Sequence, residues 1–425
     1  METSTVRSTE DSHIMPPVPT SDTIEDTVTG TESSTSTGTT TESPLADGMR
    51  SLLDDGRTSP EEAPPEVVVY LTQNSTTHHK DEVPESLASL KHAKDKGYGD
   101  RSLLPISDPY SDGTTTYDGA FGDAAKDMTW WQDDSELSNG QVKIGDKVLT
   151  LGAQSQDPSD TDVAQIREDW RTMLLHVGLA KDRADAVVGA LLTDSAGNAK
   201  LTESGAGASN ELAQLIAVFD RAERGEFEIH SVVLSGHHYS DTNYLFGEDD
   251  DHNYDSDVVT GDTLNLKDIE ALKGVFPKAF SQVKSVMLNA CNTYDLDMQD
   301  KDGKDLSTNE WFQDVFPNVE SAAYWEGIAP GPDMGAFYAG EFILDTVRKD
   351  GGDETAYKDA RYKKTSSGSS IRSETGEDGT LSDVSVKRDT KSYVYNDYKG
   401  MRDSSGEAFH ERDDLMEKLY KKKED

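Results

Sequence analysis

Hydrophobic positions recur at helical spacing in the first half of the central region. Each of these segments places its apolar residues on one face at intervals of three and four, which is typical of an amphipathic helix. The pattern predicts helices over residues 163–177, 183–192 and 210–222. A plausible stop signal, Gly178, follows the first of them.

The period then changes from helical to that of buried strands. Residues 229–235 and 283–289 are short and largely apolar, as expected of strands covered on both faces of a parallel sheet. A helical pattern separates them, and a further strand (321–325) and a helix ending near 348 follow. Strands alternating with helices predict an α/β fold with a mostly parallel central sheet and flanking helices.

The first ordered element in this interpretation is a hairpin over 141–150, with Gly145-Asp146 at its turn. The chain before it is polar, and the apolar stretch 66–72 stands alone among Pro and charged residues, so it receives little weight. The predicted organisation is a disordered region rich in Ser, Thr and acidic residues (1–135), a folded domain (139–350) and a charged extension (351–425). Residues 392–395 offer the extension an edge strand.

Composition sharpens this division and excludes some partners. Only 34% of the chain is hydrophobic and its formal net charge is −41, so part of it is expected not to fold. Such acidity argues against binding nucleic acid or anionic lipid, which requires clustered Lys and Arg. No apolar run approaches 18 residues, so no insertion into a membrane is expected. The first 30 residues lack the pattern of a secretory signal, which predicts a cytoplasmic protein or one exported without a cleavable signal.

The two central strands both end in reactive side chains. The first runs into Gly236-His237-His238 and the second into Ala290-Cys291-Asn292; Cys291 is the only cysteine, which excludes an intrachain disulfide. Carboxyl ends of neighbouring parallel strands meet at one edge of a sheet, where ligands bind. An imidazole beside a thiol can activate it as a nucleophile, so His237 and Cys291 are the candidate catalytic pair. Taken singly, each residue is more often structural, and the argument depends on their joint placement.

At these residues the sequence resembles the caspase-like cysteine peptidases, which include caspases, metacaspases, separase, gingipains and bacterial CHAT-domain proteins. The matching motifs are Val232-Val-Leu-Ser-Gly-His237 and Val286-Met-Leu-Asn-Ala-Cys291-Asn-Thr293, and the resemblance covers about 145–348. It implies the caspase–haemoglobinase sandwich, hydrolysis of peptide bonds in a protein or peptide substrate, and no cofactor. It also implies oxyanion donors in the backbone N–H groups of His238 and Cys291. One departure is that His238 stands where the family usually has Gly.

The resemblance also indicates where the side chain preceding the cleaved bond would bind. The corresponding regions contain only polar and acidic candidates, namely Asp241, Asn289, Glu326 and Asp333. An acidic pocket favours Arg or Lys at the cleaved position. Basic residues such as Arg50, Arg57 and Lys80 in the N-terminal region would then be sites of self-processing.

The acidic loops also suggest a calcium-binding site. Asp249 and Asp251, and separately Asp300 and Asp302, supply the oxygen ligands that calcium prefers, although a solvated charged loop is the favoured interpretation. The segment around Asp300 does not fit an EF-hand register.

Two alternatives to a peptidase stay open. One is a catalytically inactive caspase-like module that serves as a binding platform or secreted effector, and the other is a hydrolase of another acyl bond.

Overall fold

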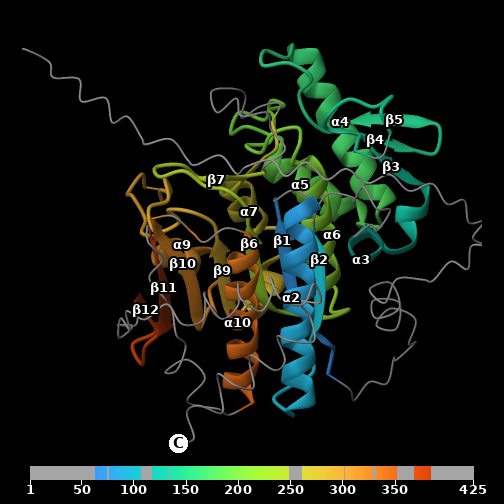
Figure 1. Cartoon of the computed structure of the whole chain (residues 1–425). Coiled ribbons are helices and arrows are strands. Elements are labelled where there is room, and N and C mark those ends of the chain that lie inside the picture. Colours follow the sequence, from blue (N-terminus) through green and yellow to red (C-terminus); the bar gives the residue numbers. More distant parts are fainter. Residues whose placement is uncertain are drawn as a thin grey trace, which may run out of the picture. The chain divides into compact units, whose positions relative to one another are not determined.

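The fold is built on a seven-stranded mixed sheet (Figure 1). Its strands in spatial order are β12 (Leu381–Asp383), β11 (Gly368–Thr375), β10 (Ser321–Gly327), β9 (Ser285–Asn289), β6 (Glu228–Ser235), β1 (Glu66–Thr72) and β2 (Ser102–Ile106). The five from β2 to β10 are parallel, and β11 and β12 add an antiparallel edge. The α/β class with a mostly parallel sheet is therefore confirmed.

The computed structural model describes most of the central region of the chain. The described residues are 63–73, 76–106, 117–132, 134–247, 261–300, 302–327, 329, 332–351 and 368–383. All of them belong to one structural unit, residues 43–425.

Two helices cover one face of the sheet. They are α2 (Thr76–Asp95) and α10 (Pro332–Asp350), which pack side by side (Figure 1). Alternate residues of β1, β6 and β10, such as Val68, Val233 and Trp325, point into this layer, and all three are buried. The alternation of side chains along a strand therefore divides these apolar strands between two cores.

The remaining helices belong to the core on the other face. They are α3 (Tyr117–Phe121), the 3₁₀ helix η1 (Gly122–Asp127), α4 (Asp160–His176), α5 (Lys181–Leu191), α6 (Ser209–Glu223), α7 (Leu266–Leu272), α8 (Pro277–Gln282) and α9 (Thr308–Val315). Two small sheets accompany them, β3 (Met128–Trp130) with β4 (Gln141–Ile144) and β5 (Lys147–Thr150), and β7 (Tyr244–Phe246) with β8 (Thr263–Asn265). The predicted hairpin, the three predicted helices and the strands over 229–235, 283–289 and 321–325 are confirmed, with ends shifted by a few residues.

The folded region begins earlier in the sequence than predicted. Residues 66–72 and 102–106 were assigned to the disordered region, and the structure places them in the central sheet as β1 and β2. Strand β1 lies between β2 and β6, and its residues Val68 to Leu71 have no exposed surface. Its short apolar run is stabilised by strands distant in sequence, which a local pattern cannot reveal. The rest of the predicted disordered region before residue 63 lies outside the described residues.

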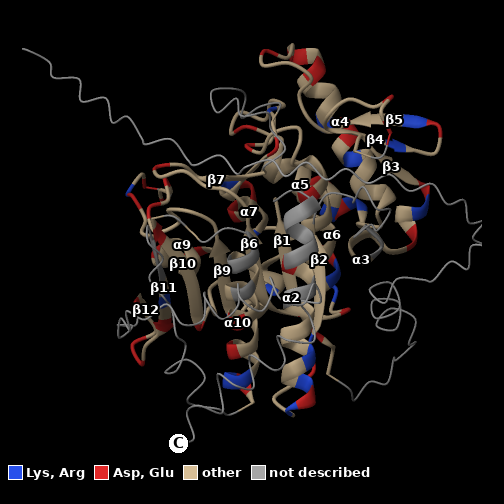
Figure 2. Ribbon diagram, viewed as in Figure 1, with Lys and Arg blue, Asp and Glu red and all other residues tan. Residues whose placement is uncertain are grey.

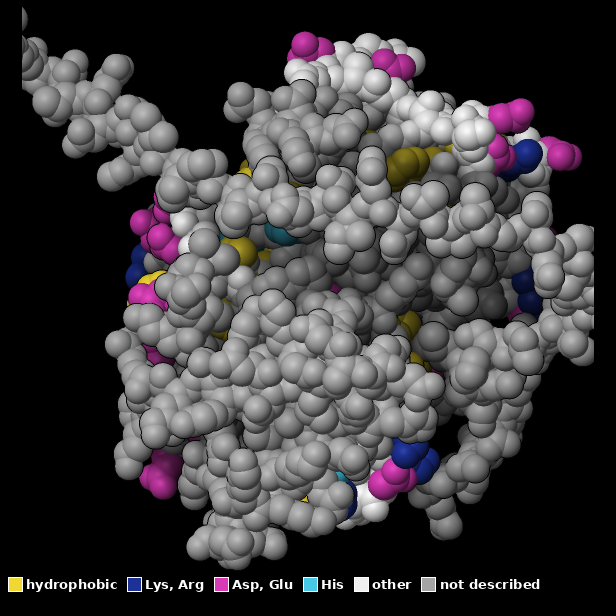
Figure 3. Space-filling view, viewed as in Figure 1, with side chains coloured by type: hydrophobic (Ala, Val, Ile, Leu, Met, Phe, Trp, Pro, Cys, Tyr) yellow, Lys and Arg dark blue, Asp and Glu magenta, His cyan; other side chains and the backbone are white. Residues whose placement is uncertain are grey.

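The C-terminal extension also contributes to the sheet. Its edge strands are β11 and β12, whereas the predicted strand at 392–395 lies outside the described residues. In the view of Figures 2 and 3, the acidic residues of the described ranges are spread over several helices and loops. Among the helices that the structure describes, none is long and apolar enough to cross a membrane.

Candidate active site

The register of two neighbouring strands brings the predicted pair to one edge of the sheet. β6 and β9 are parallel neighbours, and their last paired residues are Ser235 and Asn289. His237 and Cys291 each lie two residues beyond this pair. Adjacent strands are about 4.8 Å apart, so both residues lie at the same carboxyl edge. The edge is also next to the point between β1 and β6 where the strand order reverses, which is where open α/β sheets bind ligands.

His237 is held by strand β7, which crosses this edge. Its backbone N–H donates to the carbonyl of Phe246 (2.8 Å), and the N–H of Phe246 donates back to the carbonyl of His237 (3.1 Å). The two rings also stack, with centroids 5.4 Å apart. The His237 side chain is half-buried, with its Nε2 atom shielded from solvent, and its backbone is fixed by the two hydrogen bonds to Phe246.

Cys291 lies at the start of a sharp turn that is anchored to β10. The next residue, Asn292, has a left-handed backbone (φ 52°), and its N–H donates to the carbonyl of Gly327 (2.7 Å). The N–H of Tyr294 donates to the carbonyl of Trp325 (2.9 Å). These bonds fix the half-buried thiol at the junction of β9 and β10.

The environment of the Cys291 thiol makes it a weaker acid than an ordinary cysteine thiol. Burial raises the pKa of the Cys291 thiol above its ordinary value, and hydrogen bonds from the backbone N–H groups of Ala329 and Cys291 to the sulfur act in the opposite direction. This shift is opposite to the one that a protonated histidine causes, since a nearby imidazolium lowers the pKa of a thiol and keeps it as a thiolate. A nucleophilic Cys291 therefore requires a base that removes its proton during the reaction.

The side chain of His238 points inward and joins the two strand ends. Its Nδ1 lies 2.8 Å from the carbonyl oxygen of Cys291 and its Nε2 lies 3.2 Å from that of Thr242. The residue is only 2% exposed, and burial lowers the pKa of its imidazole. A neutral ring donates from one nitrogen only, so one of these two contacts lacks a proton. His238 thus has a buried side chain with a structural role, and its backbone N–H as an oxyanion donor stays a prediction.

The four residues proposed for the substrate pocket have different environments. Asp241 and Glu326 are exposed at the carboxyl edge, and Asp241 has a left-handed backbone (φ 59°). Asn289 is only 5% exposed; its side chain accepts a hydrogen bond from Trp325 Nε1 (3.3 Å) and donates to Ser235 Oγ (3.4 Å). Asp333 belongs to α10, and its side chain lies outside what the structure describes. Two exposed carboxylates are therefore at the edge, and Asn289 lies below it.

A buried polar cluster beneath the edge was not predicted from the sequence. Glu82 of α2 is 1% exposed and accepts a hydrogen bond from Ser235 Oγ (2.6 Å), which connects it to Asn289. Burial and the Glu82 carboxylate together raise the pKa of the Tyr70 hydroxyl well above its ordinary value. The only sequence signal was Asn289, a polar residue ending an apolar strand, because Glu82 lies in the region predicted to be disordered.

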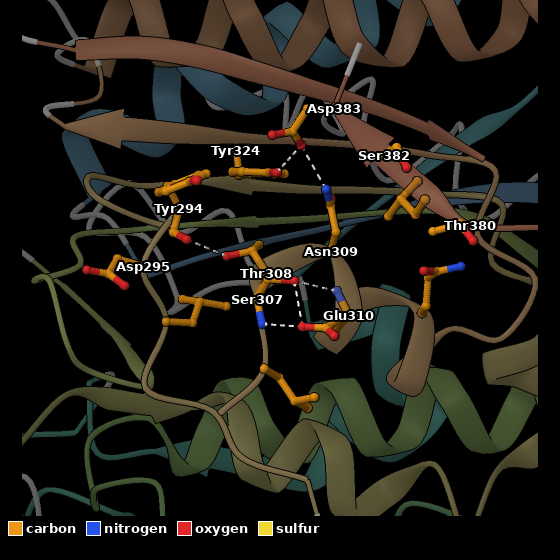
Figure 4. A pocket seen from close by; sticks show the side chains of 14 residues that line it. Tyr294, Asp295, Ser307, Thr308, Asn309, Glu310, Tyr324, Thr380, Ser382 and Asp383 are labelled. Carbon is orange, nitrogen blue, oxygen red and sulfur yellow. Dashed lines mark hydrogen bonds between the residues drawn. The ribbon is translucent and has the colours of Figure 1, made fainter. Parts of the chain in front are cut away.

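A pocket of about 520 Å³ opens beside the turn that follows Cys291 (Figure 4). Tyr294 and Tyr324 form one wall, with ring centroids 6.2 Å apart. At the Tyr324 end of this wall, Asp383 accepts hydrogen bonds from the Tyr324 hydroxyl (2.6 Å) and from the Asn309 side-chain amide (2.8 Å). The polar groups of the pocket largely hydrogen-bond with one another, and these hydrogen bonds hold β12 against β10 and α9.

The calcium candidates do not form a site among the residues that can be placed. Asp249 and Asp251 lie outside the described residues. The Asp300 carboxylate accepts the backbone N–H groups of Asp302 and Lys304, both at 2.9 Å, which closes a turn. Within the described ranges no group of three or more His, Cys, Asp or Glu side chains is arranged to hold a metal ion.

Comparison of the chain with protein-family models, with curated proteins and with solved structures gave no match. The functional argument therefore depends on the geometry of the carboxyl edge.

Proposed function

We propose that the protein is a caspase-like cysteine endopeptidase, with Cys291 as nucleophile and His237 as general base and acid. The observation that carries the proposal is the parallel pairing of β6 and β9, whose register brings both residues to one edge of the sheet. The order of the parallel strands, with β2 and β1 preceding β6, β9 and β10, supports a caspase-like arrangement. The antiparallel strands β11 and β12 extend the sheet beyond β10.

The chemistry follows from the two side chains. His237 takes the proton of the Cys291 thiol as the sulfur attacks the carbonyl carbon of the peptide bond. The negative charge on the carbonyl oxygen is stabilised by backbone N–H groups, for which His238 and Cys291 are the candidates. His237 then gives its proton to the leaving amine, and water hydrolyses the thioester to regenerate the thiol. Because burial raises the thiol pKa, proton transfer accompanies attack in this scheme.

The charge at the carboxyl edge supports a preference for Arg or Lys before the cleaved bond. The segments that follow β6 and β9 (236–247 and 290–297) and the last two residues of β10 (326–327) contain no Lys or Arg. They contain four acidic residues, Asp241, Asp295, Asp297 and Glu326. Repulsion between like charges in such a surface disfavours an acidic side chain.

A cleavage assay on the full chain tests the proposal. Fluorogenic peptides ending in Arg, Lys, Asp or Leu are incubated with wild type, Cys291→Ala and His237→Ala, with and without calcium. The proposal expects cleavage after Arg or Lys by wild type and losses of at least a hundredfold in both variants. Clear preference for Asp contradicts the basic pocket, and equal rates for wild type and Cys291→Ala contradict the peptidase.

Self-processing is tested separately by intact mass. Purified wild type is expected to shorten after Arg50 or Arg57, while Cys291→Ala keeps its full length. Lys80, the third basic residue predicted from the sequence, lies in helix α2 and not in an unstructured segment, so it is a poor cleavage site. Equal masses for the two proteins would contradict self-processing by Cys291.

An inactive binding module is the second candidate. Two observations favour it: the raised pKa of Cys291 and the buried ring of His238 where related peptidases have Gly. This candidate expects no cleavage of any peptide and no effect of Cys291→Ala on binding of a protein partner.

A further inference from the structure

The proposed general base, His237, is the first of three stacked rings. The His237 ring lies against the Phe246 ring, with centroids 5.4 Å apart and an interplanar angle of 27°. Phe246 also stacks with Tyr239, with centroids 4.9 Å apart and an angle of 26°. Phe246 itself is half-buried, whereas its neighbour Leu245 is fully buried in the core. The Phe246 ring therefore lies at the candidate site, against His237, and not in the interior of the core.

The backbone brings the two rings together. His237 and Phe246 exchange both of their backbone hydrogen bonds, which makes an isolated antiparallel bridge between the end of β6 and β7. The bridge requires a close approach at Gly236, where a Cβ atom would lie 3.1 Å from the Gln73 Cβ and 3.2 Å from the Phe246 carbonyl oxygen. A glycine is therefore favoured at position 236, because the absence of a Cβ atom lets β7 approach the carboxyl edge of the sheet.

We propose that Phe246 is a positioning residue for His237, a role that rests on the proposed peptidase function. The bridge fixes the backbone of His237, and the Phe246 ring restricts the plane of the imidazole. When the imidazole nitrogen accepts the Cys291 proton, the sulfur keeps the electron pair of the S–H bond and the ring becomes a cation. The face of an aromatic ring attracts such a cation.

Three variants of the full chain separate this role from simple packing. Phe246→Leu removes the ring and keeps an apolar side chain, Phe246→Tyr keeps the ring, and Tyr244→Leu removes a different ring that touches Phe246 (centroids 6.3 Å apart). The first readout is the NMR signal of the His237 ring, which the ring current of Phe246 shifts. The second is kcat and KM for a basic peptide.

The proposal expects a divided result. Phe246→Leu moves the His237 signal toward that of a free histidine and lowers kcat about ten- to a hundredfold with KM within twofold, because a misaligned base costs rate more than binding. Phe246→Tyr and Tyr244→Leu keep kcat within about threefold of wild type. If Phe246→Leu unfolds, as judged by its melting curve, Phe246→Met takes its place.

Two failures can be distinguished. A wild type that cleaves peptides and a Phe246→Leu variant with unchanged kcat and an unchanged His237 signal overturn the role of Phe246 alone. A wild type that cleaves no peptide removes the peptidase, and with it any positioning role, even where the NMR signal shows the stack.

Discussion

At the residue scale, the two adjacent histidines have opposite environments. His237 is half-buried and stacks on Phe246, whereas His238 is buried and faces the carbonyl oxygens of Cys291 and Thr242. A sequence of two histidines does not reveal which of them is the more buried. In the structure the bridge to β7 fixes the backbone at His237, and the next side chain, that of His238, is buried.

The reactivity of Cys291 provides a prediction at this scale. Because burial raises its pKa, the rate of alkylation by iodoacetamide should keep rising with pH beyond the range in which an ordinary thiol is fully ionised. The profile of the urea-unfolded protein, with the same single thiol, is the control. A midpoint for the folded protein below that of the unfolded one contradicts the environment described here.

His238 predicts a dependence of stability on pH. Burial lowers its pKa, so the unfolded state binds a proton below about pH 6.5 that the folded state does not bind, and stability falls as the pH falls. Urea unfolding at pH 7.5 and 5.5 should show a smaller decrease for His238→Gln than for wild type. An equal decrease in both proteins means that His238 titrates normally when folded.

At the element scale, a buried ion cluster holds the edge strand β11 against α10. Asp345 accepts Arg372 (3.1 Å) and Arg348 (3.3 Å), and each of the three is less than a tenth exposed. Burial raises the pKa of Asp345 to about 6 despite the opposing effect of the two guanidinium groups. The cluster thus depends on both arginines to keep the carboxylate charged at neutral pH.

Removing one of these arginines should be costly. Arg372→Met leaves Asp345 with a single partner and is expected to lower the free energy of unfolding by about 3–5 kcal/mol. The triple variant Arg372→Met/Asp345→Leu/Arg348→Met, which removes all three buried charges, should recover most of this loss. Urea denaturation of the three proteins measures both effects; a single variant within about 1 kcal/mol of wild type argues against the cluster.

The elements show how far the sequence alone could be interpreted. β6 and β9 were predictable because their apolar runs are continuous and flanked by helical patterns, and both candidate catalytic residues follow from them. β1 was not, because its short run is buried by β2 and β6, which are distant in sequence. The contacts of Glu82 and His238 were equally hidden, since they join segments that are far apart in the chain. Those of Phe246 with His237 and Tyr239 are close in sequence, but they depend on how β7 folds back on the end of β6.

At the scale of the whole molecule, the sheet joins regions that the sequence pattern separates. β1 lies between β2 and β6, so residues 63–106 supply two strands and one helix of the same sheet that carries the candidate site. A protein beginning at residue 139 would expose the edge of β6 and the apolar surface of α10 that packs on α2.

A truncation experiment follows from this arrangement. The fragment 139–425 should fail to fold cooperatively, whereas the full chain should show a single sharp thermal transition for this unit. Circular dichroism and near-ultraviolet signals during heating report the difference. A fragment that melts cooperatively and gives dispersed NMR signals shows that β1 and β2 are dispensable and contradicts the topology.

The most direct test of the central claim is covalent labelling of the full-length protein. A peptidyl acyloxymethyl ketone that ends in Arg is incubated with wild type and His237→Ala, and the intact masses are compared. The account predicts one adduct, located on Cys291 by peptide mapping, that is absent from His237→Ala and from wild type treated with the Asp-ended probe. Absence of any adduct with either probe, with calcium added as well, would contradict a catalytic pair at this edge and favour the binding module.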